Sequence, residues 1–116
     1  MAGITFFMTS ENPIKMHGIM RRISEIENTQ MVAKSENTVS GTGIVTVILE
    51  RYYFRTGGYS NAVITLLKQE ASMTACISVT NGSNSAFNFS LGTNRNFARE
   101  IIKVMNNCGF TQQADI

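Results

Sequence analysis

The sequence predicts an α+β fold: a two-layer sandwich in which two helices cover one face of a curved antiparallel sheet of five or six strands. Three observations lead to this prediction. Residues 44–91 read as four consecutive strands joined by tight turns. Apolar residues recur at helical spacing on both sides of that stretch. Most of the predicted strands are apolar on one face only, so a single helix layer suffices to bury them. The expected order along the chain is one strand, one helix, four or five strands and a last helix.

The composition is that of one small globular domain spanning residues 1–116. Hydrophobic residues make up 43% of the 116 residues and charged residues 16%, which suits a chain that buries one modest core. The longest apolar runs are far shorter than the ~20 residues that a membrane-spanning helix needs, so we expect no membrane association. The start of the chain lacks the basic and apolar regions of a signal peptide, which favours the cytoplasm. A net charge of +2 neither favours nor excludes nucleic acid.

The N-terminal segment is predicted to form a short strand followed by a helix. Residues 4–8 are β-branched or aromatic, as is typical of a strand. Asn12 suits an N-cap and Pro13 suits the first helical position, because the N–H that proline lacks would be unpaired there. We therefore expect a helix over residues 13–27, with an apolar face that consists of Met16, Ile19, Met20, Ile23 and Ile26.

The next stretch leads into the central strands. A polar edge strand is expected near residues 30–38, followed by a flexible connection over 40–43. The strand predicted at 44–55 is apolar on both faces, which is typical of a strand that is covered on both sides. The turn after it is placed within 56–59, because its two adjacent glycines can adopt positive φ.

The following strands alternate between a core face, which both helices are expected to cover, and a hydroxylated face. Val63 and Leu67 are apolar exceptions on the hydroxylated face. Placing Ile77 opposite Phe87 puts the large apolar side chains of both strands on one side, and this register requires an odd-length loop after the first of them. A two-residue Asn-Gly turn would set Ile77 against Ala86 and turn the phenylalanines outward, so we expect the odd loop. The predicted core face consists of Ala62, Ile64, Leu66, Met73, Ala75, Ile77, Val79, Phe87, Phe89 and Leu91.

A second helix is expected near the C-terminus, capped by Thr93 or Asn94. Gly109 suits the left-handed residue that ends a helix, and Phe110 can supply the apolar contact that accompanies this ending. Residues 111–116 are predicted to be a frayed tail. The apolar stripe of the helix consists of Phe97, Ile101, Val104, Met105 and Cys108.

Several short motifs follow one another in the C-terminal two-thirds of the chain. They are Glu50-Arg51-Tyr52, the Gly57-Gly58 turn, Val63-Ile64-Thr65-Leu66-Leu67, Asn81-Gly82-Ser83 with Phe87 and Phe89 after it, and Gly92-Thr93. With these motifs the C-terminal half to two-thirds of the chain resembles a family of small bacterial domains of unknown function. The N-terminal third shows no clear match, and Asn81 departs from the expected Gly-Gly-Ser turn. The resemblance implies the same order of elements and imports no activity.

Residues that carry enzyme chemistry are scarce. His17 is the only histidine, and its place on the polar side of the first predicted helix is typical of a surface residue. A dyad of His17 and Cys108 has no sequence feature that brings the two together. Cys76 and Cys108 are interpreted as free thiols. The acidic residues lack metal-binding spacing and the glycines lack the pattern of a phosphate loop. We therefore expect no catalytic residues, no metal and no cofactor.

Glu50, Arg51, Tyr52 and Tyr53 are the first candidates for a binding site. Neighbouring residues of a strand point to opposite faces, so either Glu50 or Arg51 must face the helix layer. A charge in that position needs a partner, because burying it unpaired is costly. The sequence allows a polar pocket between sheet and helices, and it also allows a structural ion pair or a strand end that reaches solvent.

A basic stripe on the last predicted helix is the second candidate. Arg95, Arg99 and Lys103 recur every four residues and so lie along one side of the helix. Such a stripe can meet phosphate groups or an acidic partner. Glu100 interrupts it, and a solvated helix face has the same pattern.

Three functional hypotheses follow. The leading one is a non-enzymatic interaction module that self-associates, because the two-sided strand 44–55 together with Val63 and Leu67 leaves apolar residues on a face without helices. The second is a carrier of a small apolar or amphipathic ligand held between sheet and helices, for which seven methionines and seven phenylalanines would suit an adaptable pocket. The third is binding of nucleic acid or an acidic partner through the basic stripe.

Overall fold

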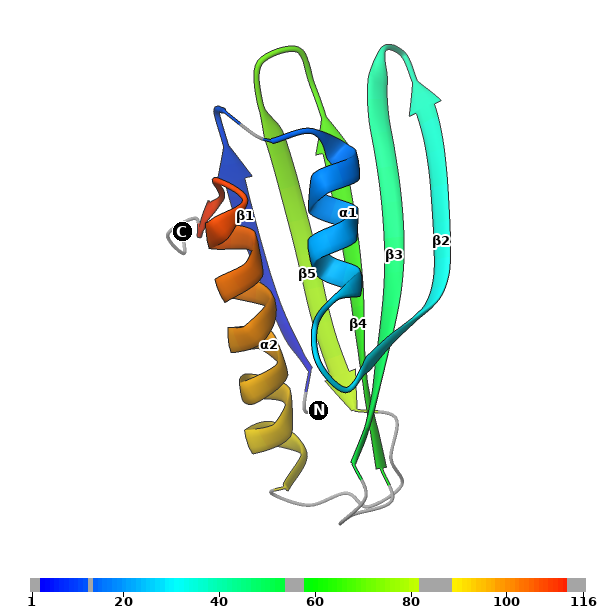
Figure 1. Ribbon diagram of the computed structural model, residues 1–116, viewed down its shortest axis with the longest axis vertical. Helices are drawn as coiled ribbons and strands as arrows, with labels where there is room; N and C mark the ends of the chain where they lie inside the picture. The colour runs from blue at the N-terminus through cyan, green and yellow to red at the C-terminus, as the bar shows by residue number, and fades with distance from the viewer. Residues whose placement is uncertain (1–2, 13, 54–57, 82–88, 113–116) are drawn as a thin grey trace.

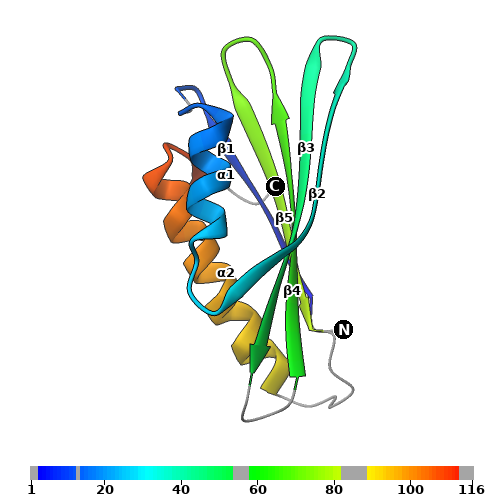
Figure 2. The ribbon, with the colours of Figure 1, turned by 45° about the vertical axis from the view of Figure 1, so that its right-hand side comes forward.

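The computed structural model describes residues 3–12, 14–53, 58–81 and 89–112, which form two helices and a six-stranded sheet (Figure 1). The elements in chain order are β1 (Ile4–Ser10), α1 (Met16–Ser24), β2 (Thr29–Val39), β3 (Thr42–Tyr53), β4 (Gly58–Lys68), β5 (Met73–Asn81), α2 (Phe89–Asn107) and β6 (Thr111–Gln112). All neighbouring strands are antiparallel, in the order β2-β3-β4-β5-β1-β6. Both helices lie on the same face of this open sheet (Figure 2), which confirms the predicted α+β architecture.

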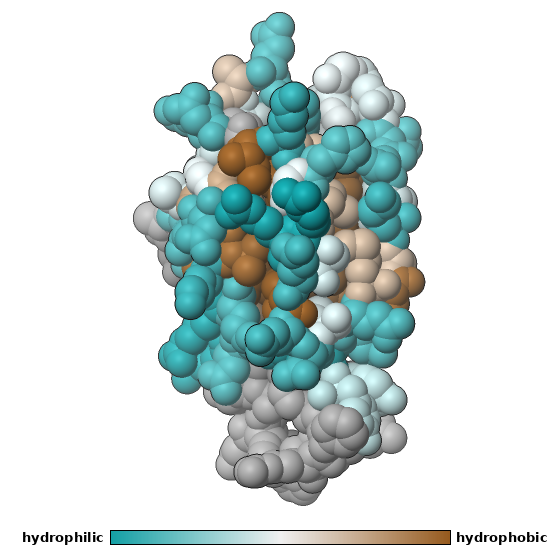
Figure 3. Space-filling model, in the orientation of Figure 1, coloured by the Kyte–Doolittle hydropathy of each residue, from teal (hydrophilic) through white to brown (hydrophobic). Residues whose placement is uncertain are grey.

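The core lies between the helices and the covered face of the sheet. Alternate residues of β4 and β5 are buried there, as the sequence pattern predicts, and so are those of β1 and β3. Seen from the helix side, the surface is largely hydrophilic, with apolar residues between the polar ones (Figure 3). The fully buried large side chains come from both layers: Phe97, Phe110, Met8, Ile19, Ile23, Leu49, Ile64, Leu66, Met73, Ile77, Ile101 and Met105.

The strand that pairs with β5 on the side away from β4 is the N-terminal strand β1. The prediction of a strand around Phe87 and Phe89 in that place is wrong. Phe6 of β1 lies opposite Ile77 in the place that we assigned to Phe87. Phe87 itself is outside the described residues, whereas Phe89 begins α2 and Leu91 follows it in the same helix. Alternation shows that a segment fits a half-buried strand but not which edge it joins. The sequence also offers a helical reading, because Phe89 continues the four-residue spacing of Phe97 and the residues after it.

Both helices begin elsewhere than predicted. The first starts at Met16, where Lys15 is in an extended conformation and provides no side-chain cap, so Asn12 is not the N-cap. Pro13 lies outside the described residues. In α2 the expected caps Thr93 and Asn94 lie within the helix. N-cap preferences are worth only ~1 kcal/mol, so tertiary packing can move a helix start past a suitable capping residue.

The C-terminal end of α2 follows the prediction. Gly109 has φ +96°, and its N–H donates to the Asn106 carbonyl at 3.0 Å. The N–H of Phe110 donates to the Met105 carbonyl at 3.0 Å, which completes the glycine-dependent helix ending, and the Phe110 side chain is buried. The predicted tail is wrong at its first two residues, because Thr111–Gln112 pairs with β1 as β6. Residues 113–116 lie outside the described part of the chain.

The edge strand predicted near 30–38 is confirmed as β2, which pairs only with β3 among the described strands. The flexible connection expected after it is instead a two-residue turn between paired Val39 and Thr42. Ser40 (φ 49°) and Gly41 (φ 81°) both adopt positive φ, as in the type I′ turn that suits the twist of a hairpin. Residues 56 and 57 of the turn predicted within 56–59 lie outside the described part of the chain, and residues 58 and 59 belong to β4.

Candidate functional site

Arg51 is the charge that faces the helix layer. Val45, Val47 and Leu49 alternate toward the helices, so Arg51 follows them and Glu50 points to the opposite face. Only 7% of Arg51 is exposed. The position in the strand therefore decides a choice that the sequence left open.

The Arg51 guanidinium is held by contacts with α2 and with the segment after α1. Its Nη1 pairs with the carboxylate of Glu100 on α2, and its Nη2 donates to the backbone carbonyl of Glu27 at 2.9 Å. The guanidinium carbon lies 4.6 Å from the centre of the Phe97 ring, within cation–π distance. These contacts join β3 to α2 and to the segment after α1. Their arrangement is that of a structural ion pair rather than of an open polar pocket.

The opposite face of the sheet, here called the open face, is covered by neither α1 nor α2, the two helices of the described residues (Figure 2). It presents the residues of β1 to β5 that alternate with the buried ones. Val63 and Leu67, both predicted for this face, are 38% and 36% exposed. Their partners across the β3–β4 pair are Ile48 and Ile44. The structure thus gathers four aliphatic side chains on two adjacent strands.

Aromatic residues extend the open face at two places. Tyr52 and Tyr59 lie opposite each other on β3 and β4, with ring centres 5.0 Å apart and an angle of 54° between the rings. Phe7 of β1 is 48% exposed and lies opposite Cys76. The sequence reasoning missed Phe7, although its alternation with buried Phe6 could have revealed it. The side chain of Tyr53 lies outside the described part of the structure.

The remainder of the open face is polar but almost without charge. Hydroxyl groups dominate β5 and β1, where the hydroxyls of Thr5 and Ser78 hydrogen-bond at 3.0 Å. Among the described residues that point to this face from β1 to β5, Glu50 is the only charged one. It lies between Asn61 of β4 and Gln30 of β2. Among the described residues, the open face is therefore a surface of mixed apolar and hydroxyl groups with one charged side chain, Glu50.

The basic stripe occupies a different part of the molecule. Arg95, Arg99 and Lys103 are exposed on the solvent side of α2, in the same layer as Glu100 and away from the open face. Glu100, which interrupts the stripe in the sequence, is engaged with Arg51. The structure does not bring these three cations to the other candidate residues.

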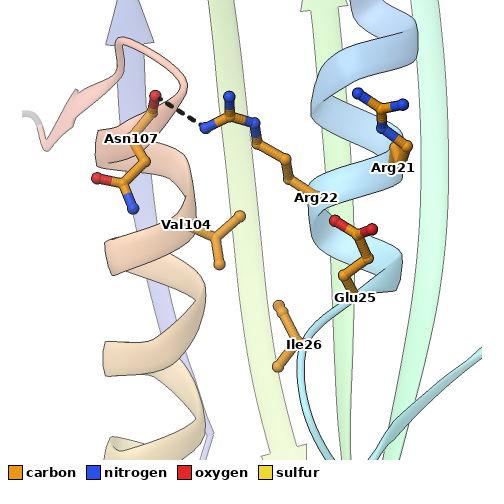
Figure 4. Close-up of a pocket in the computed structure, with 6 residues that line it drawn as sticks. All are labelled: Arg21, Arg22, Glu25, Ile26, Val104 and Asn107. Atoms are coloured by element: carbon orange, nitrogen blue, oxygen red, sulfur yellow. Dashed lines mark hydrogen bonds between the residues drawn. The ribbon is translucent and has the colours of Figure 1, made fainter.

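A groove between the two helices was not predicted, because it depends on how α1 and α2 pack (Figure 4). It has a volume of about 520 Å³. Arg22 reaches across it and donates from Nη1 to the Asn107 carbonyl at the end of α2, 3.4 Å away. Its lining consists of Arg21, Arg22, Glu25, Ile26, Val104 and Asn107. A groove with this polar rim differs from the apolar pocket that a carrier of apolar ligands would need.

His17 and Cys108, the two residues considered for a dyad, differ in their exposure to solvent. His17 is exposed, as predicted. Cys108 is buried, and burial raises the pKa of its thiol, an effect that the nearby Arg22 charge partly opposes. In the described ranges, no three residues of the His, Cys, Asp and Glu types come together as a possible metal site. Across those same ranges, neither helix has the length and apolarity to span a membrane.

The comparisons with known proteins extend the resemblance seen in the sequence. No curated protein matches the chain. A model of a family of unknown function, DUF6054, matches residues 1–109. The match includes the N-terminal third, so our restriction of the resemblance to the C-terminal half or two-thirds was wrong. That third supplies β1, α1 and β2, which are integral to the sheet and its helix layer. The chain therefore belongs to the DUF6054 family, whose function is unknown.

Proposed function

We propose that the protein is a non-enzymatic interaction module that binds a second copy of itself through the open face of its sheet. The observation that carries this proposal is the near absence of charge on a face that no helix covers. A sheet face that serves only as a solvated surface is normally rich in polar and charged side chains. The core of a protein interface, in contrast, is depleted of charge.

Apart from Glu50, the described charges of the strands lie elsewhere. Lys34, Glu36 and Lys68 are paired in register with Val47, Val45 and Met73, respectively, so they belong to the helix side of the sheet. On the open face Val63, Leu67 and the tyrosine pair are exposed to solvent, and Ile44 and Ile48 are partly buried. Covering them with a second copy of this face removes apolar area from water, and Glu50 is the one described charge of the face that the contact has to accommodate.

The size of the open face also suits a dimer. Five strands about 4.8 Å apart, each contributing about nine residues of 3.4 Å, span roughly 24 by 30 Å, or about 700 Å². A stable interface of standard size takes about 800 Å² from each partner. Apart from Glu50, the described residues of this face carry no charge in either copy, so the contact requires little charge complementarity and can close into a two-fold dimer.

Light scattering coupled to size exclusion tests the proposal. At low micromolar concentration the wild type should elute with twice the 12.8 kDa mass of the chain. Val63→Glu introduces a charge at the centre of the open face and should yield a monomer, because an unpaired carboxylate would be buried in the interface. Lys103→Glu, on the solvent side of α2, serves as the matched control and should leave the dimer intact.

Circular dichroism should confirm that both variants are folded. A wild-type monomer at these concentrations contradicts the proposal. So does a dimer that Val63→Glu leaves unchanged, because that dimer would have to form through another surface, such as the exposed edge of β2 or the basic stripe.

A further inference from the structure

The open face has a bulky half and a small half, which meet between β4 and β5. On β3 and β4 the side chains include Ile44, Ile48, Val63 and Leu67. On β5 and β1 they are mainly threonine and serine. Three side chains in the central part of the face depart from this division, Thr46 and Thr65 in the bulky half and Phe7 in the small half, and all three fall in the same row across the sheet.

The strand registers define three central rows on the open face. The first row reads Ile48, Val63, Ser78, Thr5 from β3 to β1. The second reads Thr46, Thr65, Cys76, Phe7. The third reads Ile44, Leu67, Thr74, Thr9. In the outer rows the larger residues lie on β3 and β4, whereas in the middle row the largest residue lies on β1.

Each row is complementary in side-chain size to the same row read in the reverse direction. If the first row is laid over its reverse, isoleucine meets threonine and valine meets serine. In the third row isoleucine and leucine each meet threonine. In the middle row phenylalanine meets Thr46 and Cys76 meets Thr65. All of these pairs except that of Cys76 with Thr65, which are similar in size, join a larger side chain to a smaller one, as interdigitation of two packed faces requires.

Building on the proposed function, we propose that two copies pack open face to open face about a two-fold axis that runs parallel to the strands, above the boundary between β4 and β5. This is the rotation that lays each row over its own reverse. A two-fold axis across the strands would instead set the first row on the third, with isoleucine on isoleucine and valine on leucine. Phe7 would also lie on Phe7, and the serines and threonines of the small halves would face one another and leave gaps, because the larger side chains would hold the sheets apart.

The twist of packed sheets offsets their strands by about 30°, so the correspondence of rows holds best near the axis. Thr65 and Cys76 are the middle-row residues on the two strands beside that axis. The pairing across the interface is therefore best defined beside the axis, where Thr65 faces the partner's Cys76 and Cys76 faces the partner's Thr65. Disulfides bridge two packed sheets in this way in immunoglobulin domains.

Cross-linking of a mixed dimer tests this geometry. Thr65 and Cys76 are also neighbours within one chain, so the two cysteines must be placed on different copies. One copy is the wild type, with Cys76, and the other is Thr65→Cys/Cys76→Ser with a size tag. Oxidised glutathione accepts the two electrons of disulfide formation. Cys108 is buried under the helices in both copies and serves as an internal non-reacting thiol.

The expected result is a covalent heterodimer in the mixture and no covalent dimer from either protein alone. A two-fold axis across the strands would give the opposite result, since Cys76 would face the partner's Cys76 and the wild type alone would cross-link. That outcome overturns the proposed orientation, and so does a dimer that cross-links in no combination. A wild type that light scattering shows to be monomeric overturns the proposed function itself, so the two failures are distinguishable.

Discussion

Removing Arg51 should destabilise the fold strongly, because this residue ties β3 to α2 and to the segment after α1. The substitution Arg51→Ala deletes its ion pair with Glu100, its hydrogen bond to the Glu27 carbonyl and its contact with the Phe97 ring. It also leaves a space where a nearly buried side chain had been. Each loss acts in a site from which water is largely excluded.

The magnitude follows from the environment of each contact. The hydrogen bond from a charged donor to a carbonyl contributes about 1.5–3 kcal/mol. The ion pair is worth at most about 1 kcal/mol, because the Glu100 side chain is 45% exposed. The stacking on Phe97 adds about 1–2 kcal/mol where it is desolvated. Because these contributions are not additive, we expect Arg51→Ala to lower the free energy of unfolding by about 3 kcal/mol.

Urea unfolding followed by circular dichroism measures the effect, and the midpoint should fall by about 2 M for a domain of this size. All proteins must be compared at one concentration, because self-association would add to apparent stability. Glu100→Gln should cost only about 1 kcal/mol, because it leaves the carbonyl and ring contacts in place. Lys34→Ala removes an exposed ion pair with Glu36 and should cost less than about 0.5 kcal/mol. A loss below about 1 kcal/mol for Arg51→Ala would refute a structural role for the residue.

Three further predictions concern backbone and thiol positions. Gly109→Ala should lower the free energy of unfolding by about 1 kcal/mol, because φ +96° disfavours a Cβ; thermal denaturation measures it, and an unchanged melting temperature would contradict the helix ending described above. Ser40→Asn should raise the urea midpoint slightly, by about 0.5 kcal/mol in unfolding free energy, since asparagine tolerates the left-handed region better than serine in this turn beside Gly41; a lower midpoint would count against the turn type. Burial raises the pKa of the Cys108 thiol above its usual 9.0, so the folded state holds this proton more tightly than the unfolded state. The thiol's contribution to the free energy of unfolding is therefore fully present below pH 9 and is lost as the pH rises beyond it. The difference in unfolding free energy between the wild type and Cys108→Ala should shrink between pH 8 and pH 10. A constant difference would show that the thiol titrates alike in the folded and unfolded states.

The candidate site was predictable to the extent that it depends on alternation. The period of two along a strand places Val63 and Leu67 opposite the core residues, and the structure finds them exposed on the open face. The same period leaves the orientation of Arg51 open, because the strand is apolar on both sides. The alternation of Phe7 with Phe6 indicates that the two point to opposite faces, but the position of Phe7 beside Cys76 depends on the pairing of β1 with β5, which no local pattern predicts.

The sequence by itself determined the α+β class, the existence of both helices, the faces of the central strands and the glycine at the end of α2. These features depend on local periodicity and on backbone conformations that particular residues favour. Only the tertiary structure decided which strand pairs with β5, where each helix begins and which of Glu50 and Arg51 faces the helices. These choices depend on contacts between residues distant in the chain, such as that between Phe6 and Ile77. Local residue preferences favour the alternative arrangements almost equally, so the choice between them is made only when the whole sheet forms.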